Sequence, residues 1–122
     1  MKKTITINYK KKEIKIIVED CNAFRKFSGL MFSRKEKTNI LLFNFKKKQK
    51  IAIHSFFVFY PFIAVWLDEK NNVVDLKIVK PFNLCVSPKE SGFKLVEVPI
   101  NGKNKKICDF FFEPQLLVDY KI

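Results

Sequence analysis

The stretch IAIHSFFVFYPFIAVWL, residues 51–67, contains no charged residue and constrains the fold more than any other part of the sequence. A membrane-spanning helix needs about 20 apolar residues, whereas this run is shorter and carries a histidine, a serine and a proline near its middle. Its β-branched and aromatic residues favour strands. We therefore expect no membrane span, but two strands at 51–59 and 62–67, separated by Pro61, which cannot donate a strand hydrogen bond.

Both faces of these two expected strands are apolar, which is typical of central strands in a packed sheet or small barrel. His54, the only histidine, is then expected on an apolar strand face, as a structural imidazole rather than a catalytic or ligating one. The neighbouring aromatic residues are expected to pack in the core rather than stack on nucleic-acid bases: Phe56, Phe57, Phe59 and Trp66.

The rest of the chain has mostly strand-like patterns. TITINY and EIKIIVE alternate apolar and polar residues around a lysine turn and predict a hairpin with Ile5, Ile7, Ile14 and Ile16 toward the core. A change of period predicts one short helix near residues 22–29, ended by Gly29. Further strands are expected at NILLFNF, VVDLKIV, FKLVEVP and KKICDFFFE, and the tail 114–122 is ambiguous.

These elements predict a single mainly β (α+β) domain over residues 1–122. We expect a small antiparallel sheet, curled into a partly closed barrel or a two-layer sandwich, with the one short helix near residues 22–29. Repeats, low-complexity linkers and domain boundaries are absent from the sequence. The 122 residues suffice for one core.

The net charge of +12 raises the question of a polyanionic partner. Nearly all the basic residues are lysines, and only Arg25 and Arg34 offer the planar guanidinium that binds phosphate or guanine at two points. The lysine runs fall mostly at expected hairpin tips, where charge discourages sheet-edge aggregation. The charge therefore indicates a solvated surface, with nucleic-acid binding expected to be weak and non-specific.

Few catalytic or metal-binding patterns are present. Three glycines cannot build a phosphate loop, and three distant cysteines without a CxxC pair indicate neither a zinc ribbon nor a disulfide framework. We expect no metal and no cofactor, reduced thiols, a cytoplasmic location and no export signal at the lysine-rich start. Ser87, Glu97 and Glu113 lack visible catalytic partners, and both glutamates are expected on solvated faces.

The order of several motifs resembles domain of unknown function 192, an uncharacterised family of bacteria and archaea. FRKFSGLMFSR, NILLFNF, IHSFFVFYPFIAVWLDEKNNVVDLKIVKPF and SPKESGFKLVEVP carry this resemblance over about residues 22–99, and the IH pair is similar to the archaeal branch. The matching positions are Gly29, Leu30, Met31, Arg34, His54, Pro61, Leu67, Asp68, Val73 and Val74. The resemblance implies a compact, mainly β domain with a short helix and implies no established activity.

The chain departs from the family pattern at three places. Ser55 stands where the family often has Met, Ile63 stands where it has Asp, and Cys108–Asp109 replace its usual Gly–Asp pair. A family function that depended on the missing Asp would be lost in this chain.

Two functional hypotheses remain open on the sequence. The first is a small cytosolic, non-catalytic binding or scaffold module, which the lack of a catalytic constellation favours over an enzyme. The second is an enzyme or anionic-ligand-binding domain. Its cleft would be lined by His54, Arg34, Met31 and Gly29. The partner and the oligomeric state are not indicated by the sequence.

Overall fold

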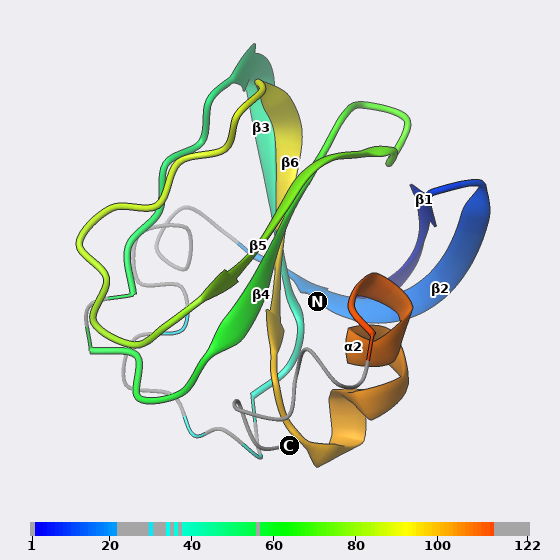
Figure 1. Cartoon of the computed structure of the whole chain (residues 1–122). Coiled ribbons are helices and arrows are strands. Elements are labelled where there is room, and N and C mark those ends of the chain that lie inside the picture. Colours follow the sequence, from blue (N-terminus) through cyan, green and yellow to red (C-terminus); the bar gives the residue numbers. More distant parts are fainter. Residues whose placement is uncertain are drawn as a thin grey trace.

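The computed structural model describes residues 2–21, 30, 34, 36, 38–55 and 57–113. Six strands form one curled sheet in the order β1-β2-β3-β6-β4-β5 (Figure 1). The elements are β1 (Lys2–Tyr9), β2 (Lys12–Asp20), β3 (Leu41–Gln49), β4 (Phe62–Leu67), β5 (Val73–Val79), β6 (Gly92–Pro99), the 3-10 turn η1 (Gly102–Asn104) and the helix α2 (Lys105–Phe111). The expected mainly β class with a curled sheet is confirmed.

The hairpin of β1 and β2 forms as the alternation of apolar and polar residues predicts. Its turn residues Lys10 and Lys11 both have positive φ angles, 49° and 65°, as a two-residue type I′ turn requires. The register pairs Ile5 with Ile16 and Ile7 with Ile14. Ile7 and Ile16 are buried and the other two pack partly against the same core, so the predicted inward set is confirmed.

The sheet is not antiparallel throughout, because β2 and β3 pair in parallel over two residues. The two outer strands also approach each other. The Asn8 amide donates to the Asn71 carbonyl oxygen at 2.9 Å, and Asn8 forms a parallel bridge with Asn72, just before β5. This contact brings the edges together and gives a partly closed barrel.

The concave side of the sheet holds the larger core, which α2 covers (Figure 1). Cys108 and Phe111 of α2 pack among residues such as Ile7, Val65 and Val98. The expected strand at KKICDFFFE is therefore wrong. The Asn101 side chain accepts a hydrogen bond from the Asn104 amide at 3.0 Å and starts a turn, and the apolar residues then recur at helical spacing.

The convex side carries a second core, and β4 is buried on both faces as predicted. Ile63, Val65 and Leu67 face the concave core, whereas Phe62, Ala64 and Trp66 face the convex one. Residues 51–55 and 57–60, which we term segment 51–60, cover this convex side as a loop. The expected strand at 51–59 is therefore wrong: among residues 51–55 and 57–59, only Ile53 forms an isolated bridge, with Val86.

Two expectations lie outside the described residues: the short helix near 22–29, including Gly29, and the conformation of the tail 114–122. Within residues 2–21, 38–55 and 57–113, and the isolated positions between them, no helix is long and apolar enough to span a membrane.

Candidate functional site

A pocket of about 260 Å³ lies on the convex side of the sheet. Its walls come from β3, the start of β4, β6 and the segment that follows β3. Most of the lining is aliphatic or aromatic, and the polar contributions come from Gln49, Lys50, His54 and Glu97. The lining residues are Leu30, Phe43, Phe45, Gln49, Lys50, Ile51, Ala52, Ile53, His54, Val58, Phe62, Leu95 and Glu97. An apolar cavity with a few polar groups is the usual form of a small-molecule site.

Glu97 is the unusual member of this lining. It lies on β6 between Leu41 of β3 and Ala64 of β4, at the centre of the sheet, and only 5% of it is exposed. Residues two apart on a strand share a face, so Glu97 follows Leu95 onto the convex side, where Leu41 and Ala64 also pack. A carboxylate is costly to bury and is kept in such a place only with compensating interactions.

The expectation of a solvated Glu97 is wrong. The available signal was its position in FKLVEVP, where it is the one acid among alternating apolar residues of a strand. The convex face of β6 is buried because segment 51–60 covers it, and that segment was expected to be a strand instead. The alternation of FKLVEVP therefore places Glu97 on the convex face of β6, as observed. The sequence pattern does not show that segment 51–60 covers this face.

His54 is an exposed residue of the loop 51–60 and contributes to the pocket lining. Its expected place on a buried strand face is therefore wrong. The loop is held against the sheet on both sides of His54. The Trp66 indole Nε1 donates to the Ile51 carbonyl oxygen at 2.8 Å, and the buried Ser55 bonds to the loop after β5. These bonds fix the backbone that carries the imidazole.

The remaining residues of the expected cleft are placed as follows. Arg34 is exposed and is not among the residues that line the pocket; its carbonyl oxygen accepts a hydrogen bond from the Thr38 hydroxyl at 2.5 Å. Gly29 and Met31 lie outside the described residues. Of the expected set, the structure brings only His54 to this pocket within the part of the chain it describes.

The three cysteines lie apart and all are free thiols. Cys21 and Cys108 are buried and Cys85 is exposed. Burial, with the negative charge of Asp109 beside it, raises the pKa of the Cys108 thiol to about 11. Among residues 2–21, 38–55, 57–113 and the few described between them, no three His, Cys, Asp or Glu side chains are grouped as metal ligands.

The fold and pocket together define a small, mainly β domain with a ligand-sized cavity on the convex side of its sheet. The chain is 31% identical over 91 residues to a UPF0127 protein of Pyrococcus furiosus, across 74% of this chain and 78% of that protein. It therefore belongs to the UPF0127 family, which is uncharacterised. No protein-family model matches the chain.

Two solved structures share the fold. One is a candidate transcription regulator from Sinorhizobium meliloti, with a TM-score of 0.73 at 14% identity, over 88% of this chain and 87% of that chain. The other is a protein of unknown function from Novosphingobium aromaticivorans, with a TM-score of 0.68 at 13% identity, over 86% of this chain and 77% of that chain. At such identities the likeness concerns the fold alone.

Proposed function

We propose that the chain is a non-catalytic binding module whose ligand occupies the convex-side pocket. The observation that carries this proposal is Glu97, an acid that is 5% exposed and lines a cavity of about 260 Å³ whose other lining residues are mostly apolar in type. Such a cavity gives affinity through its apolar walls and orientation through its polar group. We therefore keep the hypothesis of a non-catalytic binding module and propose the convex-side pocket as its site.

The lining favours a small amphiphilic amine as the ligand class. Phe43, Phe62 and Leu95 offer apolar contact to the body of a ligand. The carboxylate of Glu97 would accept charge-assisted hydrogen bonds from an ammonium head. An anionic ligand has less support: Lys50 also lines the pocket and would attract an anion, but Lys50 is exposed, whereas Glu97 is buried in the pocket and Arg34 is not part of the lining.

A matched pair of probes tests this ligand class. Phenethylamine and phenylacetate have similar apolar bodies and opposite charges. We expect phenethylamine to raise the melting temperature of the full chain in a concentration-dependent way, since a ligand that binds only the native state stabilises it. Phenylacetate should have little effect. The reverse preference would support an anionic ligand and contradict the proposal.

Two variants locate the binding. Glu97→Gln keeps the side-chain shape and removes the charge, and it should abolish the effect of phenethylamine. Arg34→Ala, outside the described lining, should leave the effect unchanged. A Glu97→Gln chain that melts lower but still responds fully to phenethylamine would assign Glu97 a structural role. Chemical turnover of the bound probe would support the enzyme alternative instead.

We also infer that the family of this chain is the one that its motifs resemble, domain of unknown function 192. The ordered motifs support this inference, and the departure at Ile63 leaves the proposed site intact. Ile63 is fully buried in the concave core, whereas the neighbouring Ala64 faces the pocket side. The cytoplasm remains the proposed location, which the three free thiols support.

A further inference from the structure

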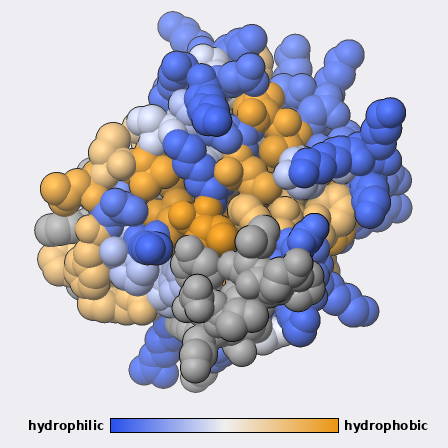
Figure 2. All heavy atoms as spheres, in the orientation of Figure 1, coloured by the Kyte–Doolittle hydropathy of each residue, from blue (hydrophilic) through white to orange (hydrophobic). Residues whose placement is uncertain are grey.

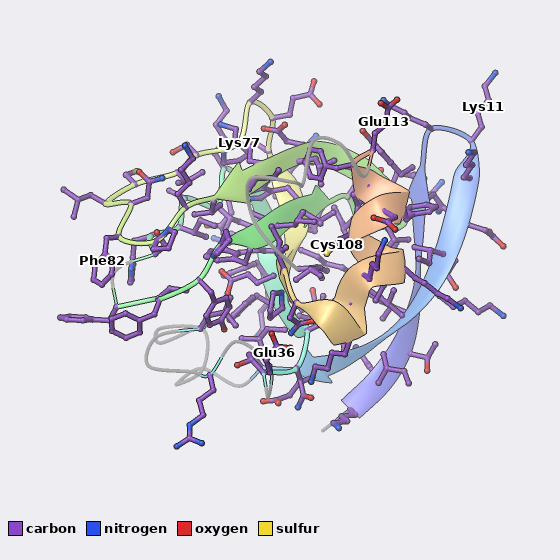
Figure 3. The ribbon with its side chains drawn as sticks, turned by 60° about the horizontal axis from the view of Figure 1, so that its bottom comes forward. Lys11, Glu36, Lys77, Phe82, Cys108 and Glu113 are labelled. Atoms are coloured by element: carbon purple, nitrogen blue, oxygen red, sulfur yellow. The ribbon has the colours of Figure 1, made fainter. Side chains whose placement is uncertain are left out.

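Four large apolar side chains are exposed on two neighbouring loops. They are Phe57 (38% exposed), Phe59 (60%), Phe82 (47%) and Leu84 (76%), and together they form what we term the apolar tip. Figure 2 shows apolar side chains over the left edge of the molecule, where these loops lie in Figure 1. Phe82 projects from the end of the molecule opposite Lys11 (Figure 3).

The three rings of the apolar tip form one continuous cluster. Phe82 lies between the other two, with ring centroids 6.3 Å from Phe57 and 5.4 Å from Phe59. Both contacts are edge-to-face, at interplanar angles of 72° and 70°. The rings thus come from two loops but make a single apolar wedge, unlike an isolated exposed residue, which is ordinary on a protein surface.

The buried Ser55 holds the two loops in register. Its hydroxyl donates to the Lys80 carbonyl oxygen at 2.5 Å and accepts from the Asn83 amide at 2.6 Å. Its carbonyl oxygen accepts from the amides of Val58 and Phe82, at 3.0 and 2.9 Å. This network fixes the loops from beneath the wedge, so the rings are presented on a defined backbone.

Two of these phenylalanines have a backbone conformation that is rare for them. Phe57 and Phe82 both have φ angles of 59°, in the left-handed region that bulky residues seldom adopt. Such conformations cost free energy and gather at functional sites, where the surrounding structure maintains them. The side chains of Phe57 and Phe82 are exposed, so packing in the core does not explain their left-handed backbone conformation.

The charge around the apolar tip selects an anionic partner. The two loops and their flanking residues, 50–60 and 75–91, carry four lysines, Lys50, Lys77, Lys80 and Lys89. They carry two acids, Asp75 and Glu90, and the Asp75 carboxylate accepts a hydrogen bond from the Lys89 amide at 2.8 Å. All of these lysines except the half-buried Lys77 are exposed. The whole chain has a net charge of +12, so a second copy would be repelled at this face.

The composition of the tip favours a lipid surface over a nucleic acid. Single strands bind through rings on which successive bases stack, but here the rings already contact each other edge-to-face and the most exposed residue is the aliphatic Leu84. Apolar side chains that enter the headgroup region, flanked by lysines that attract anionic lipids, are the usual combination for peripheral membrane binding. We propose that the apolar tip docks the protein onto an anionic membrane surface.

Vesicle sedimentation with the full chain tests this proposal. We expect binding to phosphatidylcholine vesicles that contain phosphatidylserine, weaker binding to pure phosphatidylcholine, and loss of binding as salt is raised. Equal binding to both vesicle types, or no binding to either at low salt, would overturn the proposal.

Substitutions at the apolar tip test whether this surface is the one that binds the membrane. Phe82→Asn removes the ring, and asparagine tolerates the left-handed conformation; combined with Leu84→Ser it should weaken vesicle binding at least about tenfold. Ile17→Thr is the matched control, because Ile17 is 65% exposed on β2, outside the two loops. Thermal melts verify that each variant is folded. An unchanged vesicle affinity of the double variant, or an equal loss of affinity in Ile17→Thr, would exclude the apolar tip as the membrane-binding surface. If the double variant instead lost single-stranded DNA binding and kept vesicle binding, the apolar tip would be a nucleic-acid-binding surface.

Discussion

The indole nitrogen of Trp66 donates a hydrogen bond to the carbonyl oxygen of Ile51 at 2.8 Å, inside the convex core. This bond joins the centre of the sheet to the loop that forms one wall of the pocket. Trp66→Phe removes the donor, leaves the Ile51 carbonyl without it and opens space in the core. We expect the free energy of unfolding to fall by about 2–4 kcal/mol.

Urea denaturation followed by circular dichroism measures this change, because Trp66 is the only tryptophan and its fluorescence is lost in the variant. In the parent chain, the emission of the fully buried Trp66 should shift to longer wavelength on unfolding. A Trp66→Phe chain as stable as the parent would show that neither the bond nor the packing matters.

Gly92 and Gly102 offer a pair of glycines with opposite surroundings. A Cβ atom at Gly92 would lie 2.8 Å from the backbone oxygen of Leu67, whereas at Gly102 it would meet nothing within 4 Å. Gly92→Ala should therefore destabilise the chain by about 1–3 kcal/mol. Gly102→Ala should change stability by less than about 0.5 kcal/mol, and thermal melts distinguish the two. Equal effects would contradict the close approach at β6.

Asp68 organises the turn between β4 and β5. Its carboxylate accepts from the amides of Lys70 and Asn72 and from the Asn72 side chain, at 2.8, 2.9 and 3.1 Å. Partial burial raises the pKa of Asp68, but these hydrogen bonds and the charge of Lys70 outweigh it and hold the pKa below its ordinary value of 3.8. Asp68→Asn should therefore destabilise the chain by about 1–2 kcal/mol at neutral pH.

The pH dependence of this contribution has a defined sign. Because the pKa of Asp68 is lower in the folded state, its stabilisation is fully present above the unfolded value and is lost as pH falls through the folded value. The difference between the parent and Asp68→Asn should thus shrink on acidification below pH 3.8. Glu69→Gln, at the exposed neighbour, is the control and should leave the profile unchanged. A constant difference at all pH values would contradict the shift.

The thiols should differ strongly in reactivity. The exposed Cys85 should react rapidly with a thiol reagent in the native state, whereas Cys108 is buried and its pKa is raised to about 11 by that burial and by Asp109. Cys85→Ser should remove the fast phase of the thiol reaction.

The raised pKa of Cys108 also means that the stability of the fold decreases as pH rises from 9.0 toward 11, since in this range the Cys108 thiol ionises only in the unfolded chain. Cys108→Ala should lack this part of the decline in urea titrations.

Nucleic-acid binding remains a prediction from the charge. We expect weak, sequence-independent and strongly salt-dependent binding, because lysine contacts to phosphate do not identify bases. Fluorescence anisotropy with two unrelated DNA sequences at two salt concentrations measures it. Tight binding that survives high salt, or a clear sequence preference, would contradict this interpretation.

The sequence predicted most strands because their patterns are local. The alternation in TITINY and EIKIIVE determines which isoleucines face inward, and the uncharged FIAVWL identifies β4 as a central strand. The sheet class follows from such patterns. The aromatic residues of KKICDFFFE favour a strand by propensity. The helix α2 has no side-chain cap of its own and follows the turn η1, which Asn101 caps, so residues 105–113 alone do not indicate it.

The candidate site was predicted less well because it depends on contacts between distant residues. The conformation of residues 51–60 is set by Ser55 bonding to residues 80–83 and by Trp66 bonding to Ile51. Neither bond leaves a local pattern, so the apolar run predicted a strand. His54 was assigned to a cleft, but the burial of Glu97 required knowledge of this covering loop.

The strand order has a consequence for biosynthesis. β6, the last of the described strands along the sequence, lies between β3 and β4, which have no pairing with each other among the described residues. Until residues 92–99 leave the ribosome, β3 therefore has one open edge and the fully apolar β4 can pair only with β5. Between the synthesis of β4 and that of β6, the nascent chain thus carries two unsatisfied strand edges, and its sheet can close only in a late step.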